Sequence, residues 1–126
     1  DNQDGVTDGE YEAVTGPDGI VTLIANGDAT ARTLSYPRDI EVHDGKLYVA
    51  DMDNHRVLVW NEIPSQSFVP ADAVIGQADF TSNEMNAGEA RPNDHGFQRP
   101  VGVTIIDGKL FVTEWENSRV TVFEGN

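Results

Sequence analysis

The chain has no cysteine, and only eight of its 126 residues are lysine or arginine. Without cysteine it forms neither a disulfide nor a thiolate metal site. Its 22 acidic residues give a formal net charge of −14, and such a surface repels the phosphates of nucleic acids and of anionic lipids. We therefore expect neither a nucleic acid nor a membrane as a partner.

Long hydrophobic runs are also missing, because none approaches the roughly 20 apolar residues of a membrane-spanning helix. Hydrophobic residues make up 38% of the chain and aromatic residues 8%, beside 12 glycines and 6 prolines. This composition, with its many Asp and Asn residues, is typical of a turn-rich, all-β domain. An acidic chain without cysteine fits an extracellular or periplasmic location, which is our expectation.

What the sequence does contain is a long internal repeat. Residues 37–60 and 100–123 lie 63 positions apart and are identical at 10 of 24 positions without a gap. Ordinary amino-acid usage would give roughly one or two identities by chance. A repeat of this length indicates one supersecondary unit that is copied and stacked, because a single copy cannot bury its own apolar face.

Each copy predicts three strands joined by two turns. The first turn is a two-residue hairpin signal, Asp44-Gly45 or Asp107-Gly108. The second turn carries Asn54 or Asn117, a residue type that tolerates a left-handed backbone. The predicted strands are Ile40–Val42, Lys46–Ala50 and Arg56–Trp60 in the first copy, and Val103–Ile105, Lys109–Thr113 and Arg119–Phe123 in the second.

A fourth strand is predicted after the first copy, at Ala73–Gly76. The second copy has no room for one before Asn126, but the β-branched run Gly19–Ala25 precedes the first copy as Ala73–Gly76 precedes the second. We therefore divide the chain into an acidic N-terminal segment, residues 1–18, and two four-stranded units within residues 19–126.

These residues carry a family resemblance. Gly45–Trp60 resembles the NHL repeat, and residues 70–83 resemble the long inter-blade segment of bacterial, mostly secreted, NHL-repeat proteins. Gly108–Phe123 is similar, with Thr113-Glu114 in place of the usual Ala-Asp. The resemblance implies a β-propeller, a radial array of four-stranded blades that often number six. The expected fold is all-β, with two NHL-like blades of such a propeller.

Two blades cannot close a ring, so further blades are the expected partners. They belong either to a longer parent chain or to other copies that associate head to tail. In the second case, residues 20–25 of one copy would add a strand to Arg119–Phe123 of the next, and three copies would make six blades. A start without Met and a stop without a tail favour the longer chain.

The N-terminal segment resembles an incomplete calcium loop. Calcium takes six to eight oxygen ligands, so such loops alternate Asp or Asn with a glycine at the sharp turn. If Gly5 is that glycine, the metal-binding candidates are Asn2, Asp4, Val6 through its carbonyl, Asp8 and Glu10. Calcium is the only cofactor that the sequence suggests, and the alternative is a solvated acidic tail.

A carboxylate, an asparagine and an arginine recur in the second turn of both copies. A guanidinium beside a carboxylate across a tight turn can pair bidentately and tie the turn to its strand. Because both copies carry the same set, we expect a structural role for Asp51, Asn54, Arg56, Glu114, Asn117 and Arg119.

The most distinctive unrepeated segment is the long connection 77–99, which is either a packed strap between the units or a protein-binding loop. The candidate contacts for a protein partner are Phe80, Met85, Arg91 and Phe97 in this segment, together with Trp115 in a turn.

The expected function is a non-enzymatic scaffold or binding module that presents loops for protein contact or assembly, because the repeats carry packing residues only. The alternative is a part of a metal-dependent six-bladed enzyme of the lactonase or lyase type, which the resemblance also suggests. A zinc site needs three or four convergent ligands. No spacing brings His43, His55 and His95 together, and the repeat counterparts of the first two are Ile106 and Ser118.

Overall fold

The computed structural model describes residues 11–15, 21–25 and 29–124. These residues form nine strands and two short 3₁₀ helices. The elements are β1 (Tyr11–Thr15), β2 (Val21–Ala25), β3 (Pro37–His43), β4 (Lys46–Asp51), η1 (Met52–Asn54), β5 (Arg56–Trp60), β6 (Ala73–Ile75), η2 (Met85–Gly88), β7 (Pro100–Ile106), β8 (Lys109–Glu114) and β9 (Arg119–Glu124). No helix among them is long and apolar enough to cross a membrane.

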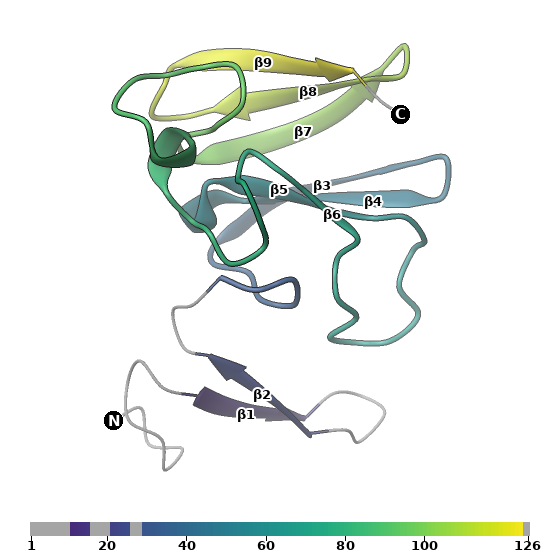
Figure 1. The fold of residues 1–126 in the computed structure, drawn as a ribbon. Coiled ribbons are helices and arrows are strands. Elements are labelled where there is room, and N and C mark those ends of the chain that lie inside the picture. Colours follow the sequence, from purple (N-terminus) through teal and green to yellow (C-terminus); the bar gives the residue numbers. More distant parts are fainter. Residues whose placement is uncertain (1–10, 16–20, 26–28, 125–126) are drawn as a thin grey trace.

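The strands form three antiparallel sheets. The first sheet has the order β3-β4-β5-β6 and the second sheet the order β7-β8-β9, while β1 and β2 pair with each other. The second sheet is stacked on the first (Figure 1). The predicted strands of both repeat copies are therefore confirmed, as is the all-β class.

The first turn of each copy has the geometry that its sequence predicts. Asp44 and Gly45 have φ of 50° and 75°, and Asp107 and Gly108 have φ of 52° and 75°. Two consecutive positive φ values are what a two-residue hairpin loop needs to match the twist of its strands. The turns set the same register in both sheets, with His43 opposite Lys46 and Ile106 opposite Lys109.

The main hydrophobic core lies between the two sheets. Side chains alternate along a strand, so Ala50, Val57 and Val59 of the first sheet face Val103, Leu110 and Val112 of the second sheet. Phe97 fills the same core from the strap 77–99, and its ring meets that of Phe123 edge-on at 5.3 Å between centroids. Each sheet thus buries one face only by packing on the other.

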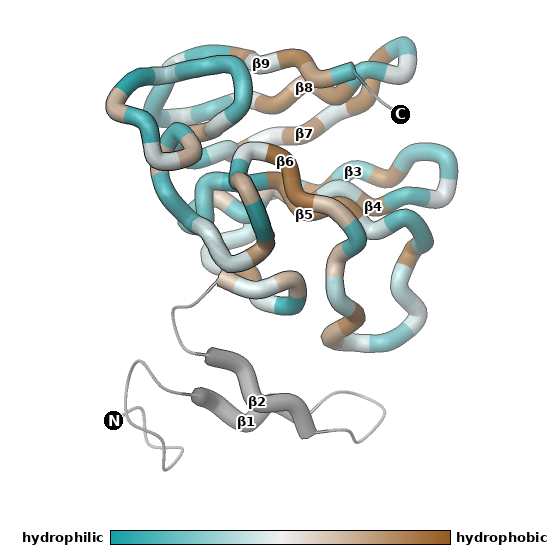
Figure 2. The backbone as a smooth tube through the Cα atoms, viewed as in Figure 1, coloured by the Kyte–Doolittle hydropathy of each residue, from teal (hydrophilic) through white to brown (hydrophobic). Residues whose placement is uncertain are grey.

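The other face of the first sheet carries a second cluster. Val49, Leu58, Trp60 and Ala71 are buried there, with Phe80 packed against them. Both faces of β5 are therefore covered, and all five of its residues are buried. In Figure 2 the hydrophobic colour is concentrated on β5 and β6 and recurs along β8 and β9.

The N-terminal strands differ from the expectation. Residues 21–25 form a strand as predicted, but they pair with β1, a strand that the sequence analysis did not predict within the acidic segment 1–18. The register joins Tyr11 to Ala25 and Thr15 to Val21. β2 is thus not an unpaired strand in this chain. The β1–β2 pair precedes the first sheet as the β5–β6 pair precedes the second.

Candidate functional site

Each sheet contains a polar cluster at its second turn, buried in the first sheet and partly buried in the second, which we call the arginine node. Its residues are Asp51, Asn54 and Arg56 in the first sheet, and Glu114, Asn117 and Arg119 in the second. Arg56 begins β5 and Asp51 ends β4, and the two residues are paired across the strands. The Arg56 guanidinium donates from Nε to Asp51 Oδ2 at 2.8 Å, and Asn54 donates to the same oxygen at 2.8 Å.

The first node binds the connections on both sides of its sheet. Nη2 of Arg56 donates to the carbonyls of Thr30 and Thr33, both at 2.8 Å, in the segment before β3. Nη1 donates to the carbonyl of Phe80 at 2.7 Å, in the strap that follows β6. Both side chains of the Arg56–Asp51 pair are fully buried. A buried charge pair is tolerated only when its remaining donors are satisfied, and these carbonyls satisfy them.

The second node repeats half of this arrangement. Arg119 donates from Nε to Glu114 Oε2 at 2.6 Å, and from Nη2 to the carbonyls of Asn93 and Gly96 at 2.6 and 3.0 Å. Its Nη1 has no hydrogen-bond partner among the residues that the structure describes. The Arg119 side chain is 27% exposed, whereas that of Arg56 is fully buried. The second sheet therefore lacks, in residues 29–124, the following segment that completes the first node.

Two expectations about these turns need correction. The arginine–carboxylate contact uses one guanidinium nitrogen, so the pair is not bidentate. The other two nitrogens of Arg56 bind backbone carbonyls, Nη1 in the strap and Nη2 in the segment before β3. The left-handed residues are His55 and Ser118, with φ of 54° and 52°, and not Asn54 and Asn117. The asparagine side chains instead donate to Asp51 and Glu114. All six residues take part in side-chain hydrogen bonds within the two turns.

Further side-chain contacts join the two sheets at the edge formed by β3 and β7. Asp39 accepts the N–H of Ile40 on Oδ1 and that of Val103 on Oδ2, both at 3.0 Å. Ile40 and Val103 are repeat counterparts, so one carboxylate binds the same backbone group of both sheets. Glu41 accepts the N–H of Ile105 at 3.4 Å in the same way. These carboxylates cover backbone donors that an edge strand would otherwise leave unpaired.

Next to the start of β7, His55 also links the two sheets. Its Nδ1 accepts the backbone N–H of Arg99 at 3.0 Å, and its carbonyl accepts the side chain of Gln77 at 2.9 Å. Burial lowers the pKa of His55, and the Arg99 charge lowers it further. The guanidinium of Arg99 lies 5.9 Å from the ring centroid of Trp115, between Asp53 at 3.8 Å and Glu116 at 4.0 Å.

The outer face of the second sheet repeats the contact face of the first sheet. Tyr48, Ala50, Val57 and Val59 pack in the core between the sheets. Their counterparts 63 positions on are Phe111, Thr113, Val120 and Val122, which we call the outer face. Val120 is 59% exposed and Val122 49% exposed. Apolar side chains that are buried in one copy are thus open to solvent in the other.

The residues proposed as partner contacts have different environments. Phe97 is fully buried in the core, so it is not available to a partner and the expectation for it is wrong. Phe80 packs on the second cluster of the first sheet. Met85 and Trp115 are exposed large hydrophobic residues, at 52% and 58%, and Arg91 is exposed as well. The strap 77–99 therefore packs through Phe97 and Phe80 and presents Met85 and Arg91.

The histidines and acidic residues do not form a metal site in the described part of the chain, where no group of three or more His, Asp or Glu side chains is placed to hold an ion. His43 lies beside Asp44, and His95 lies between Asp94 and Glu89, whose hydrogen bonds raise its pKa. The calcium candidates Asn2, Asp4, Val6, Asp8 and Glu10 lie outside the described residues.

Sequence reasoning missed Asp39 and Glu41, which connect the two sheets, and Gln77, which ties the strap 77–99 to the second turn of the first sheet. No local sequence pattern predicts their contacts, because their partners lie 64, 64 and 22 residues away. The signal available was a departure from the repeat, since Asp39 and Glu41 face Gly102 and Thr104 in the alignment of the copies.

Comparison with known proteins adds one finding. The family model of the NHL repeat matches residues 34–60 and again residues 97–123. No curated protein and no solved structure was found to match the chain. Each match begins just before the proline that opens β3 or β7 and ends in β5 or β9, so it covers three strands and one arginine node. Residues 34–60 and 97–123 therefore each match the NHL repeat, and the two matches support an NHL-repeat protein.

Proposed function

We propose that this chain is part of an NHL-repeat β-propeller that acts as a non-enzymatic scaffold for protein contact and assembly outside the cytoplasm. NHL repeats are often protein-binding scaffold modules. The single observation that carries the proposal is the exposed outer face of the second sheet. Because Val120 and Val122 repeat the buried Val57 and Val59, the partner that fits this face is a further sheet of the same kind.

The second arginine node supports the same partner. In the first node, Nη1 of Arg56 binds a carbonyl of the strap that leads to the next sheet. The corresponding Nη1 of Arg119 has no partner among the described residues. A further NHL unit would place its strap carbonyl at this nitrogen and its apolar strands on the outer face. The partner would thus make both a hydrogen bond to Arg119 and apolar contacts with the outer face. This combination favours a specific partner over a nonspecific one.

The histidines support a role without catalysis. His55 accepts a backbone N–H between the sheets, and His95 is held by two carboxylates of the strap. Both contacts are structural. Calcium binding by residues 2–10 stays a prediction, and it is checked by the melting temperature with added calcium against added magnesium, since a ligand specific to the native state raises it.

The test of the proposal uses the whole chain and the double variant Val120→Asp/Val122→Asp. The mass in solution and the binding of a dye that reports exposed apolar surface are measured for both proteins. We expect the native chain to associate into multiples of 13.7 kDa, or to stay a monomer that binds the dye strongly. The first result assigns the partner to a second copy, and the second assigns it to another unit of a longer chain.

The double variant should abolish the association or the dye binding without lowering the melting temperature, because its side chains face outward. The matched control is Val57→Asp/Val59→Asp, which places the same charges in the buried core and should unfold the chain. The proposal is wrong if the outer-face variant unfolds the chain as the control does, or if it leaves association and dye binding as they were.

A further inference from the structure

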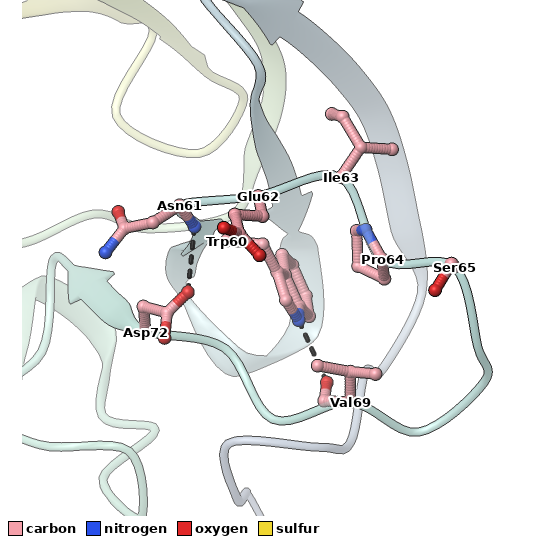
Figure 3. A pocket seen from close by; sticks show the side chains of 8 residues that line it. All are labelled: Trp60, Asn61, Glu62, Ile63, Pro64, Ser65, Val69 and Asp72. Carbon is pink, nitrogen blue, oxygen red and sulfur yellow. Dashed lines mark hydrogen bonds between the residues drawn. The ribbon is translucent and has the colours of Figure 1, made fainter.

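A pocket of about 400 Å³ lies in the loop between β5 and β6, and neither the repeat nor the contacts between the sheets uses it. The loop, residues 61–72, folds around the indole of Trp60, and Figure 3 shows the lining side chains gathered about that ring. The volume lies within the lower range of small-ligand sites and is large enough for one side chain of a partner.

Hydrogen bonds hold the loop in this shape. The N–H of Asn61 donates to Asp72 Oδ2 at 2.8 Å, and the N–H of Asp72 donates to the carbonyl of Val59 at 2.8 Å, so the two ends of the loop are tied together. The indole Nε1 of Trp60 donates to the carbonyl of Val69 at 2.9 Å (Figure 3), which fixes the far side of the loop. The pocket is therefore preorganised by contacts within its own loop.

The walls of the pocket combine apolar and anionic groups. Trp60, Ile63, Pro64 and Val69 supply the apolar surface, and Ile63 and Val69 are among the exposed large hydrophobic residues of the described chain. Glu62 and Asp72 supply the charge, and no lining residue is basic. In the described part of the chain Glu62 has no hydrogen bond or ion pair, and Asp72 uses only Oδ2.

An arginine or lysine side chain matches this lining. Its methylene stem can cover apolar surface while its cationic head stays at the polar rim. There it can pair with the carboxylates of Glu62 and Asp72. The net charge of −14 attracts a basic segment at long range and repels an acidic one. We propose that this pocket binds the side chain of an arginine or lysine presented by a basic segment of a protein partner.

The inference rests on the protein-binding role proposed above and names the chemistry of one contact. Its test is independent of any further blade, because it uses small amides as probes. In the variant Trp115→Phe the only remaining tryptophan is Trp60, so fluorescence reports on the floor of the pocket. The probes are the methylamides of N-acetyl-arginine, of its neutral isostere N-acetyl-citrulline, and of N-acetyl-glutamate.

We expect a saturable change with the arginine probe, with millimolar affinity because the ligand has few atoms. The citrulline probe should bind several-fold more weakly and the glutamate probe should give no response. Glu62→Gln should lower the affinity for the arginine probe about 2- to 5-fold, as expected for the loss of an exposed ion pair. The matched control is Glu124→Gln, which removes the same charge from an exposed site at the end of β9. It should leave the affinity for the arginine probe unchanged.

Two results would overturn the inference. The first is the absence of a saturable response to the arginine probe. The second is that the arginine and citrulline probes bind equally well, both to the protein with an intact pocket and to the Glu62→Gln variant. Circular dichroism of each variant confirms that it is folded. If the outer-face test above fails while the arginine probe binds, the scaffold proposal is wrong and the pocket is real, so the two failures remain separate.

Discussion

The backbone N–H of Arg99 donates a 3.0 Å hydrogen bond to Nδ1 of His55, 44 residues earlier in the chain. Nδ1 can accept this bond only while it carries no proton. The contact joins the second turn of the first sheet to the residue that precedes β7, so the packing of the two sheets depends on a neutral imidazole.

This dependence predicts a loss of stability at mildly acidic pH. Burial and the Arg99 charge lower the pKa of His55 below its usual value of about 6.5, while Asp53, Asp51 and Glu116 oppose the shift. Between pH 6.5 and the lowered folded pKa, His55 binds a proton in the unfolded chain but not in the folded chain. The free energy of unfolding therefore falls as the pH drops from 7 through 6.5 towards the lowered folded pKa.

Denaturant unfolding at a series of pH values measures this effect. The variant His55→Ser, which carries the residue of the second copy at this position, should be less stable at pH 7 and should lack this part of the pH dependence. His95, whose pKa is raised by Asp94 and Glu89, contributes with the opposite sign, mainly above pH 6.5 and therefore next to this range. The comparison is therefore made in a His95→Asn background, and equal pH profiles of the two proteins would contradict the prediction.

The arginine nodes predict unequal costs for one substitution at two equivalent positions. Arg56→Lys removes the planar guanidinium, itself fully buried, from three backbone carbonyls and should lower the free energy of unfolding by at least about 2 kcal/mol. Arg119→Lys is the matched control, and it should cost about half as much because its side chain is partly exposed and water can reach its partners. Urea unfolding of both variants measures the difference, and equal costs would show that the following strap contributes nothing.

The strap 77–99 predicts a strict requirement for glycine at one position. A Cβ at Gly96 would lie 2.4 Å from the carbonyl carbon of Asn86 and 2.5 Å from the nitrogen of Ala87. Because both atoms belong to the backbone, Gly96→Ala should displace the strap and lower the free energy of unfolding by about 1–3 kcal/mol. Gly102→Ala, whose nearest contact is the Thr113 hydroxyl at 3.3 Å, should cost clearly less in the same thermal or denaturant measurement.

The bridging carboxylate of Asp39 gives a test of the contact between β3 and β7. Asp39→Asn keeps one acceptor oxygen and places an NH₂ group against the N–H of Ile40 or of Val103. We expect a loss of about 0.5–1.5 kcal/mol in the free energy of unfolding, the net contribution of one hydrogen bond, because these contacts are exposed or only part-buried. Asp44→Asn, at an exposed hairpin turn that accepts either residue, should be neutral; a similar loss in both variants would rule out a specific role for Asp39.

Much of this architecture could be predicted from local pattern. The Asp-Gly turns, the alternation along β4 and β5 and the arginine of each node all act over a few residues, and repetition at a fixed offset confirmed each of them twice. The strand β1 was hidden by the acidic composition of the first 18 residues. The left-handed residues are His55 and Ser118, one position after the predicted Asn54 and Asn117. The two asparagines instead donate to a buried carboxylate.

The candidate sites were less accessible from sequence. Phe97 looked like a partner contact in a polar loop, but it fills the core because the strap must cover the gap between two sheets. The pocket around Trp60 depends on how the loop 61–72 returns on itself, and its closing bonds join residues 9 and 11 positions apart. Loops of this kind have no periodicity from which their contacts could be inferred.

The sequence alone determined that two equivalent three-stranded units exist, where their turns lie and which residues form each arginine node, because hydrogen-bonding type, side-chain alternation and turn conformation are local properties. Only the tertiary structure decided which copy of an apolar position is buried. Val57 and Val120 have the same place in the repeat, and one is enclosed while the other meets solvent. Burial depends on what packs against a face, and that neighbour is specified by the rest of the fold and not by the strand itself.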